Sequence, residues 1–259
     1  MDATLPRLGV QLYTLRDEGD DLLAMVPKLA AMGYQGIELF GGQLVGLDLA
    51  HVQALLDEHG VVVASAHVGI GPDGVLDEGE LDRLQAIGTS TVVVPVLWFD
   101  HFEDRDTVAG AAESLNRVAE QAAGRGLTLG YHNHWWELAP LDDDRPALLH
   151  LFEQVDPAIV AEVDVYWAHV GGVDEAELVA GLGERVRLLH VKDGPGEDEK
   201  AAMVSVGSGA LDIPAVLGAN PAVEWHLVEL DRCDTDMYEA VAESQRYLAG
   251  LGLSAVRTP

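Results

Sequence analysis

The sequence of 259 residues is short of cysteine and of positive charge. Its single cysteine, Cys233, excludes an internal disulfide and any metal site built from several cysteines. Only 15 lysines and arginines face 44 aspartates and glutamates, for a formal net charge of −29. Because nucleic-acid binding depends on basic side chains that neutralise phosphates, this balance argues against nucleic acid and against anionic membranes as partners.

Long hydrophobic runs are also missing. No apolar stretch approaches the roughly 20 residues of a membrane-spanning helix. The first ten residues, MDATLPRLGV, lack the basic and apolar regions of a secretion signal, so we expect a cytoplasmic protein. Hydrophobic residues nevertheless make up 48% of the chain, which is enough for a substantial core.

The chain alternates between two patterns. Short apolar runs of strand type are followed by segments whose apolar residues recur at helical spacing. The strand-like runs are 8–12, 36–40, 61–66, 91–97, 127–131, 159–163, 186–189 and 227–228. The clearest helical segments are 20–32, 49–59, 81–87, 104–123, 146–155, 175–182 and 236–248, with Pro27 expected to kink the first or shift its start.

This alternation implies parallel strands joined by helical crossovers. Eight repeats without a break in composition predict a closed (β/α)8 TIM barrel of the α/β class, a single domain over residues 1–259. No GxGxxG motif follows the first run, which disfavours a dinucleotide-binding sheet. The polar segment 193–209 is expected to be a loop that covers the site.

Four successive strand-like runs end in residues that can bind a metal. The fifth leads into HNHWWEL, and the next three end in an aspartate, a histidine and a glutamate. In a (β/α)8 barrel these carboxyl ends converge on the mouth, where catalytic residues lie. Two imidazoles and two carboxylates suit a borderline divalent cation such as Mn, Co, Zn or Mg. The predicted ligands are His132, Asp164, His190 and Glu229.

The remaining strand ends offer contacts for a substrate, among them Gln11 and Tyr13. His67 is either a polar or acid–base contact or an ordinary hydrogen-bonded residue of the rim. The tryptophans near strand ends either pack between loops or form an apolar wall against a sugar face. The predicted substrate-binding residues are His67, Glu38, Trp98, Glu137 and Trp167.

Seven segments, in order and over nearly the whole chain, resemble the sugar phosphate isomerase/epimerase superfamily of xylose-isomerase-like TIM barrels. They are GVQLYTLRDE, GYQGIELF, SAHVGI, GYHNHWWEL, VDVYWAHVGG, LHVKDG and VELD. The resemblance implies one divalent ion, often manganese, held at Asp164, His190 and Glu229. Many members carry glutamate at the end of strand five. His132 stands there instead, as in the branch with a His-x-His motif that includes inosose dehydratase-like proteins, with His134 or Glu137 as alternative ligands.

The expected chemistry follows from the metal. A divalent ion that chelates a ketose carbonyl and the adjacent hydroxyl polarises the carbonyl and stabilises an enediolate. Return of the proton to another carbon or face gives an isomerase or epimerase. Loss of a β-hydroxyl or glycosyl group gives a dehydratase or lyase of a keto-polyol or keto-glycoside, and these alternatives stay open.

The candidate catalytic residues are Glu229, His134, His132 and Lys192. His132 and His134 are two residues apart and would share one face of a continuing strand. A metal-bound imidazole cannot accept a proton at the same nitrogen. We therefore expect Glu229 and one of these histidines to form the proton-transfer pair. Lys192, one of only three lysines in the chain, is a possible partner in this transfer.

Two other classes of protein share the barrel. An apurinic-site endonuclease would need a three-metal cluster and a basic DNA groove, which a net charge of −29 opposes. A non-catalytic carbohydrate-binding barrel would differ only in lacking turnover. The expected partner is a small carbohydrate, free or phosphorylated, and the protein is a possible homo-oligomer.

Overall fold

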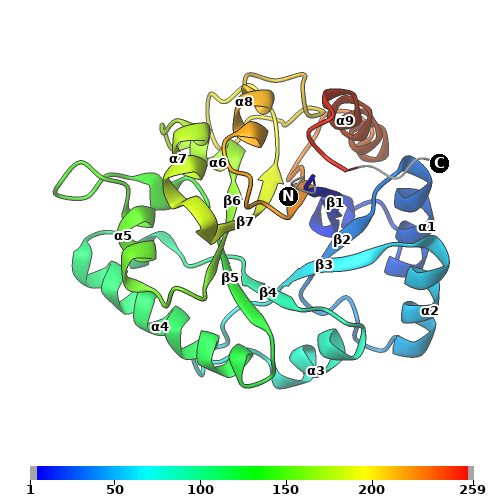
Figure 1. The fold of residues 1–259 in the computed structure, drawn as a ribbon, viewed down its shortest axis with the longest axis horizontal. Coiled ribbons are helices and arrows are strands. Elements are labelled where there is room, and N and C mark those ends of the chain that lie inside the picture. The colour runs from blue at the N-terminus through cyan, green and yellow to red at the C-terminus, as the bar shows by residue number, and fades with distance from the viewer. Residues whose placement is uncertain (1–4, 256–259) are drawn as a thin grey trace.

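Eight parallel strands pair in sequence order and close into a barrel in a computed structural model that describes residues 5–255 (Figure 1). The predicted (β/α)8 TIM barrel is confirmed. Residues 1–4, which belong to the stretch 1–10 that lacks the pattern of a secretion signal, lie outside the described residues. The strands are β1 Arg7–Gln11, β2 Gly36–Phe40, β3 Val62–His67, β4 Thr91–Val94, β5 Thr128–His132, β6 Val160–Asp164, β7 Val186–Val191 and β8 Trp225–Val228.

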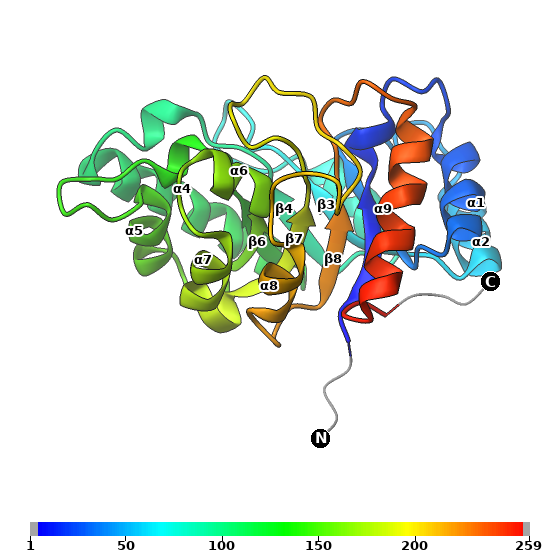
Figure 2. The ribbon, with the colours of Figure 1, turned by 90° about the horizontal axis from the view of Figure 1, so that it is seen from above.

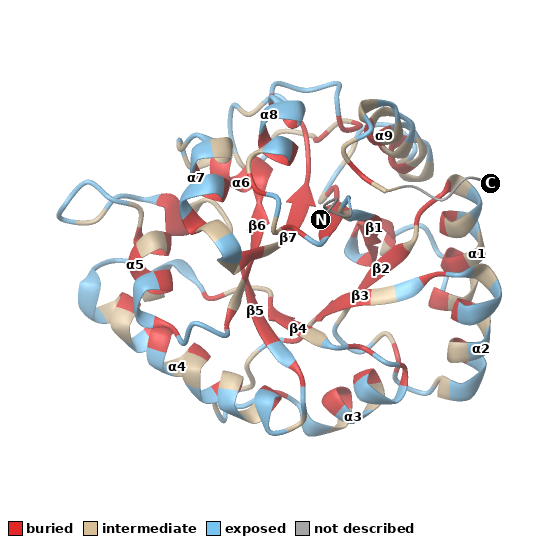
Figure 3. Cartoon of the chain, viewed as in Figure 1, coloured by how far each residue is buried: buried red, intermediate tan, exposed pale blue. Residues whose placement is uncertain are grey.

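Helices surround the barrel, and their buried faces point towards the sheet (Figures 1 and 3). They are α1 Leu22–Met32, α2 Leu49–His59, α3 Glu78–Ala86, α4 Arg105–Ala123, α5 Ala147–Gln154, α6 Val165–Val170, α7 Glu175–Leu182, α8 Ile213–Gly218 and α9 Met237–Leu251. Short 3-10 turns are η1 Leu12–Leu15, η2 Phe99–His101, η3 Trp136–Leu138 and η4 Gly183–Arg185. No helix within residues 5–255 is long and apolar enough to cross a membrane.

Aspartate starts almost every helix. Of the nine helices in the described chain, all except α5 have an aspartate at the N-cap whose side chain accepts a backbone N–H of the first turn. Such caps satisfy amide groups that have no partner within the helix. Part of the acidic excess of this chain therefore serves the fold itself.

The predicted and observed elements differ where proline or short length obscures the pattern. β4 ends at Val94 because Pro95 has no N–H to donate to a neighbouring strand. α1 starts at Leu22, two residues later than expected, and continues through Pro27. Two helices were not anticipated, α6 and α8, since six residues are too few to show a helical period.

The interior of the barrel has an apolar lower part. Ala64, Leu188, Trp225 and Leu227 form a cluster of their own, separate from the core between sheet and helices. A side chain on Gly36 would collide with the Trp225 ring, so this close packing requires glycine there. The cluster lies towards the amino-terminal part of the barrel, and the buried ionisable side chains lie towards the carboxyl ends of the strands.

The long loop after β7 is organised by one buried carboxylate. Asp193 is fully buried and accepts backbone N–H groups of Gly194, Gly207 and Gly209, each at 2.9 Å, and of Leu211 at 3.3 Å. Figure 2 shows this loop at the end of the barrel towards which the strands point. The segment 193–209 is thus a loop, as predicted, and one side chain holds its two ends together.

We predict that Asp193→Ala lowers the free energy of unfolding by about 3 kcal/mol, because it leaves several buried N–H groups without an acceptor. Denaturant unfolding would measure the loss. Glu197→Ala, an exposed change in the same loop, is the control and should stay within about 0.5 kcal/mol of wild type. Equal stability of the two variants would show that the carboxylate does not organise the loop.

Candidate active site

A cavity of about 310 Å³ opens at the carboxyl ends of the strands. Its volume is near the lower end of the range for small-molecule sites. It is lined by Tyr13, Phe40, Gly41, His67, Gly69, Pro95, Val96, His132, His134, Lys192, Glu229 and Asp231. A larger cavity of about 530 Å³ lies at the opposite end of the barrel, and the ionisable residues that line it within 5–255 are Arg7, Arg187 and Glu224. The chemistry is therefore concentrated at the mouth.

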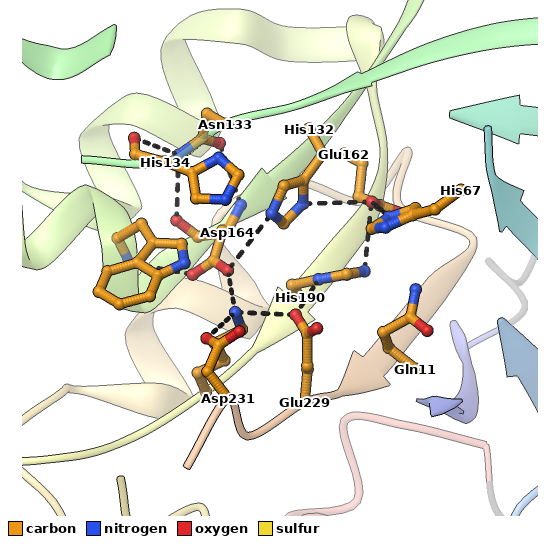
Figure 4. Close-up of polar contacts among 12 residues, drawn as sticks. Gln11, His67, His132, Asn133, His134, Glu162, Asp164, His190, Glu229 and Asp231 are labelled. Carbon is orange, nitrogen blue, oxygen red and sulfur yellow. Dashed lines mark hydrogen bonds and ion pairs between the residues drawn. The ribbon is translucent and has the colours of Figure 1, made fainter. Parts of the chain in front are cut away.

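The four predicted metal ligands meet beneath this cavity. One ligand atom each from His132, Asp164, His190 and Glu229 lies within 4.8 Å of the other three, and all four side chains are buried. His132 Nε2 is 3.7 Å from Asp164 Oδ2, and His190 Nδ1 is 2.7 Å from Glu229 Oε2 (Figure 4). These contacts show which nitrogen of each imidazole faces the group.

The position of Asp164 follows from its place at the end of β6. Its Oδ1 accepts the backbone N–H of Trp167 at 2.9 Å and so caps α6. Its own backbone N–H donates to Asn133 Oδ1 at 3.0 Å. The second carboxylate oxygen is thereby directed towards the other ligands.

The donor set fits a divalent cation. Two imidazoles and two carboxylates match the preference of ions such as manganese or zinc. Burial raises the pKa of Asp164 to about 6, although Lys192 acts against this, and the charge of Glu229 adds to it. A cation bound here would favour the ionised form of this carboxyl.

Lys192 lies among the carboxylates. Its Nζ is 2.8 Å from Asp164 Oδ2, 2.8 Å from Glu229 Oε2 and 2.7 Å from Asp231 Oδ2. Burial alone would lower the pKa of Lys192, but these three carboxylates hold it well above its usual value. The side chain is a buried cation that balances part of the negative charge.

A second layer of polar groups lies deeper in the barrel and includes a residue that the strand-end pattern did not identify. Glu162 is fully buried on β6, and its Oε2 is 2.7 Å from His67 Nε2. The same oxygen is 3.2 Å from both His132 Nδ1 and His190 Nε2. The signal was a charged residue inside the apolar run 159–163, two positions before Asp164 and so on the same face.

Glu38 belongs to this deeper layer as well. Its Oε2 accepts a hydrogen bond from Gln11 Nε2 at 2.7 Å and lies 2.6 Å from His190 Nε2, while its Oε1 accepts from Ser65 Oγ at 2.6 Å. Burial, followed by the charge of Glu162, raises the pKa of Glu38. Burial would also raise the pKa of Glu162, but His190 and His67 hold it well below its usual value.

His134 lines the cavity and rests on an aromatic stack. Its ring lies 4.4 Å from that of Trp136 at an angle of 7°, and Trp136 stacks in turn on Trp98. Burial holds the pKa of His134 well below its usual value, so the imidazole is neutral at pH 7. Its Nδ1 is buried and has no hydrogen-bond partner among residues 5–255.

The other predicted substrate-binding residues occupy different places. His67 lines the cavity, whereas Glu38 and Glu137 are fully buried outside its lining. Trp98 is 62% exposed. The centre of the Trp167 ring lies 5.2 Å from Lys192 Nζ. No residue of the loop 194–211 lines the cavity, so the loop does not form its wall.

The strand order, the polar mouth and the matched sequence together identify the family. The model of the family described as the xylose isomerase-like TIM barrel matches residues 26–219. This chain belongs to that family. Among curated proteins, no sequence matches it.

Several solved structures share the fold over nearly the full length. A sugar phosphate isomerase/epimerase from Parabacteroides distasonis is 24% identical, with 98% of each chain covered and a TM-score of 0.79. The probable 3-DHS dehydratase AsbF from Bacillus anthracis is 12% identical, with 94% and 98% covered and a TM-score of 0.76. A D-allulose 3-epimerase from Methylomonas sp. is 16% identical, with 95% and 98% covered and a TM-score of 0.68. Because each of these proteins is less than 25% identical to this chain, the similarity shows a shared fold only.

Glu137 generates a prediction about pH. It accepts hydrogen bonds from Tyr131 Oη at 2.8 Å and from the backbone N–H of His134 at 3.0 Å, and burial raises its pKa to about 8. The folded protein thus keeps a proton that the unfolded chain loses above its ordinary pKa. The stabilising effect is complete below that ordinary pKa and is lost as the pH rises towards 8.

Glu137→Gln removes this titration. We expect the free energy of unfolding to fall less between pH 5 and pH 8 in the variant than in wild type, measured by denaturant unfolding at both pH values. The comparison cancels titrations that the two proteins share. An identical pH dependence would contradict the raised pKa of Glu137.

Proposed function

We propose that this protein is an isomerase or epimerase that depends on a divalent metal, manganese foremost, and acts on a sugar or keto-sugar by removing a proton next to a carbonyl. The observation that carries the proposal is the group of four ligand atoms within 4.8 Å of one another beneath a small polar cavity. Membership of the xylose isomerase-like family supports the same class of reaction.

His132, Asp164, His190 and Glu229 would hold the ion. When bound there, a divalent ion supplies a Lewis acid for a carbonyl oxygen. The cavity above is of a size for one sugar ring, and Tyr13 and Phe40 on its wall meet edge to face with 5.4 Å between their rings. Such aromatic surfaces suit the apolar face of a sugar.

Two residues of the lining can move the proton. His134 lines the cavity, and its Nδ1 has no partner in the described chain, so its lone pair is free to accept a proton, although burial lowers the pKa of the imidazole and weakens it as a base. Burial opposes ionisation of Glu229, but Lys192 and His190 outweigh it and hold the pKa of this carboxyl well below its usual value. With His132 assigned to the metal, Glu229 and His134 are the proposed proton-transfer pair, because Glu229 could hold the ion through one carboxylate oxygen and take a proton with the other.

A dehydratase is the second candidate because elimination of a β-hydroxyl begins with the same proton removal. Its support is the shared fold with a probable 3-DHS dehydratase. Phosphodiester cleavage of DNA fits poorly, since a chain with a net charge of −29 repels the phosphate backbone. Product analysis separates the first two, because elimination lowers the mass of the product by one water.

The metal is tested first. We expect wild-type protein purified without chelator to carry one divalent ion per chain, measured by elemental analysis. Asp164→Ala should carry much less, because it removes a ligand. Glu80→Gln, a change of a buried carboxylate on α3 that pairs with Arg83 and is not a candidate ligand, is the control and should retain the ion. Equal metal content in wild type and Asp164→Ala would contradict the ligand assignment.

Proton removal is tested by solvent exchange. Wild-type protein incubated in D₂O with a panel of free and phosphorylated ketohexoses should place deuterium at the carbon next to the carbonyl of its substrate, detected by mass spectrometry. His134→Gln should keep the metal and lose most of this exchange. His51→Gln, an exposed change on α2, is the matched control. Undiminished exchange in His134→Gln would rule out His134 as the base.

A further inference from the structure

The two layers of the site share a pair of histidines. His132 and His190 belong to the upper group with Asp164 and Glu229, and also to a lower group with His67 and Glu162. Figure 4 shows the two imidazoles between Asp164 and Glu229 on one side and Glu162 on the other. Each ring therefore presents one nitrogen to each layer.

The two rings are oriented in opposite senses. His190 faces the upper group with Nδ1, and its Nε2 lies 2.6 Å from Glu38 Oε2 and 3.2 Å from Glu162 Oε2. His132 faces the upper group with Nε2, and its Nδ1 lies 3.2 Å from Glu162 Oε2. The His132 ring is not aligned for a straight hydrogen bond, and no other described residue bonds to its Nδ1.

A neutral imidazole carries one N–H and one lone pair. To bind a cation in the upper group, His190 must carry its proton on Nε2, and His132 must carry its proton on Nδ1. Both of these nitrogens face buried carboxylates of the lower layer. Histidine ligands generally donate their second N–H to such a partner, which fixes the tautomer and the ring orientation.

We propose that Glu162 is a positioning residue that keeps the proton of His132 on Nδ1 and, together with Glu38, the proton of His190 on Nε2, so that both lone pairs point at the metal site. The inference rests on the proposed function only for the presence of a cation in the upper group. It assigns to Glu162 and Glu38 a role beneath the site rather than contact with a substrate.

A second ion in the lower group is the competing interpretation, and the geometry disfavours it. With both groups filled, each of the two shared imidazoles would bind metal through both nitrogens and would have to lose its last proton. Glu38 Oε2 already lies within hydrogen-bond distance of His190 Nε2. Glu162 Oε2 lies within hydrogen-bond distance of His67 Nε2. Contacts of this kind occur in both groups, so it is the loss of the last imidazole proton that disfavours a second ion.

Through His67, Glu162 also contacts a residue that lines the cavity. Its Nε2 shares the same carboxylate oxygen at 2.7 Å, and its ring lines the cavity. One buried oxygen thus fixes a residue of the cavity wall together with the metal ligands. A change at Glu162 should disturb both.

The test uses Glu162→Ala, which removes the acceptor, and Glu162→Gln, which keeps its shape without the charge. Mn²⁺ affinity is measured by electron paramagnetic resonance of the free ion. We expect Glu162→Ala to weaken binding about 10- to 100-fold and Glu162→Gln to weaken it less. Glu80→Gln, the buried carboxylate on α3, is the control and should bind as wild type does.

Imidazole ¹⁵N spectra of the Zn²⁺-loaded protein supply a readout that a merely structural role would not change. In wild type we expect metal on Nε2 of His132 and on Nδ1 of His190. Glu162→Ala should disturb the tautomer of His132 and leave that of His190, because Glu38 still accepts its proton. Glu38→Gln should affect His190 and leave His132.

Each outcome decides a different claim. If wild type binds no divalent ion, the proposed metal function is wrong. If wild type binds Mn²⁺ and both Glu162 variants bind it equally well with unchanged spectra, the function stands and this inference fails. Should Glu162→Ala not fold, as judged by circular dichroism, Glu162→Gln alone decides, and wild-type affinity in that variant overturns the proposal.

Discussion

Four buried carboxylates crowd the carboxyl end of this barrel, and the arrangement of the mouth depends on how their charge is balanced. Glu38, Glu162, Asp164 and Glu229 are at most 4% exposed. Each would cost several kcal/mol if it were ionised and unpaired at such depth. Burial alone would lower the pKa values of Lys192, His67 and His190, but the neighbouring carboxylates raise all three, so these groups supply part of the compensating charge. A divalent cation would complete it.

The fold supplies this balance through the alternation of side chains along each strand. On β6 the inward series runs from Val160 through Glu162 to Asp164. On β7 it runs from Leu188 to His190, and Lys192 continues it directly after the strand. Apolar residues thus fill the lower part of the barrel and ionisable residues the upper part. The apolar cluster around Trp225 keeps water from the deeper carboxylates on one side. On the other side, hydrogen bonds and ion pairs contact Glu38 and Glu162 Oε2, while Glu162 Oε1 has no hydrogen-bond partner among residues 5–255.

Much of this organisation could be predicted from the sequence because strand ends are visible as a change from apolar to polar residues. The closed barrel and the place of His132, Asp164, His190 and Glu229 in it followed from that change. Glu162 was missed because it lies within a run, where the apolar pattern hides one charged residue. Period-two spacing from Asp164 would have revealed it. The contacts of Lys192 with three carboxylates could not be predicted from the sequence, since they depend on which long side chain turns inward.

The distribution of charge also bears on the kind of sugar. Lys192 is the only lysine or arginine that lines the cavity in the described chain, and three carboxylates already surround its Nζ. A phosphate group entering the cavity would meet Glu229 and Asp231 and would find no unpaired cationic side chain on the lining. Like charges at short range in a partly dehydrated site repel strongly. An uncharged sugar meets no such barrier, and its hydroxyl groups can bond to carboxylates and imidazoles alike. For the proposed function, the side chains that line the cavity therefore favour a free sugar over a phosphorylated one.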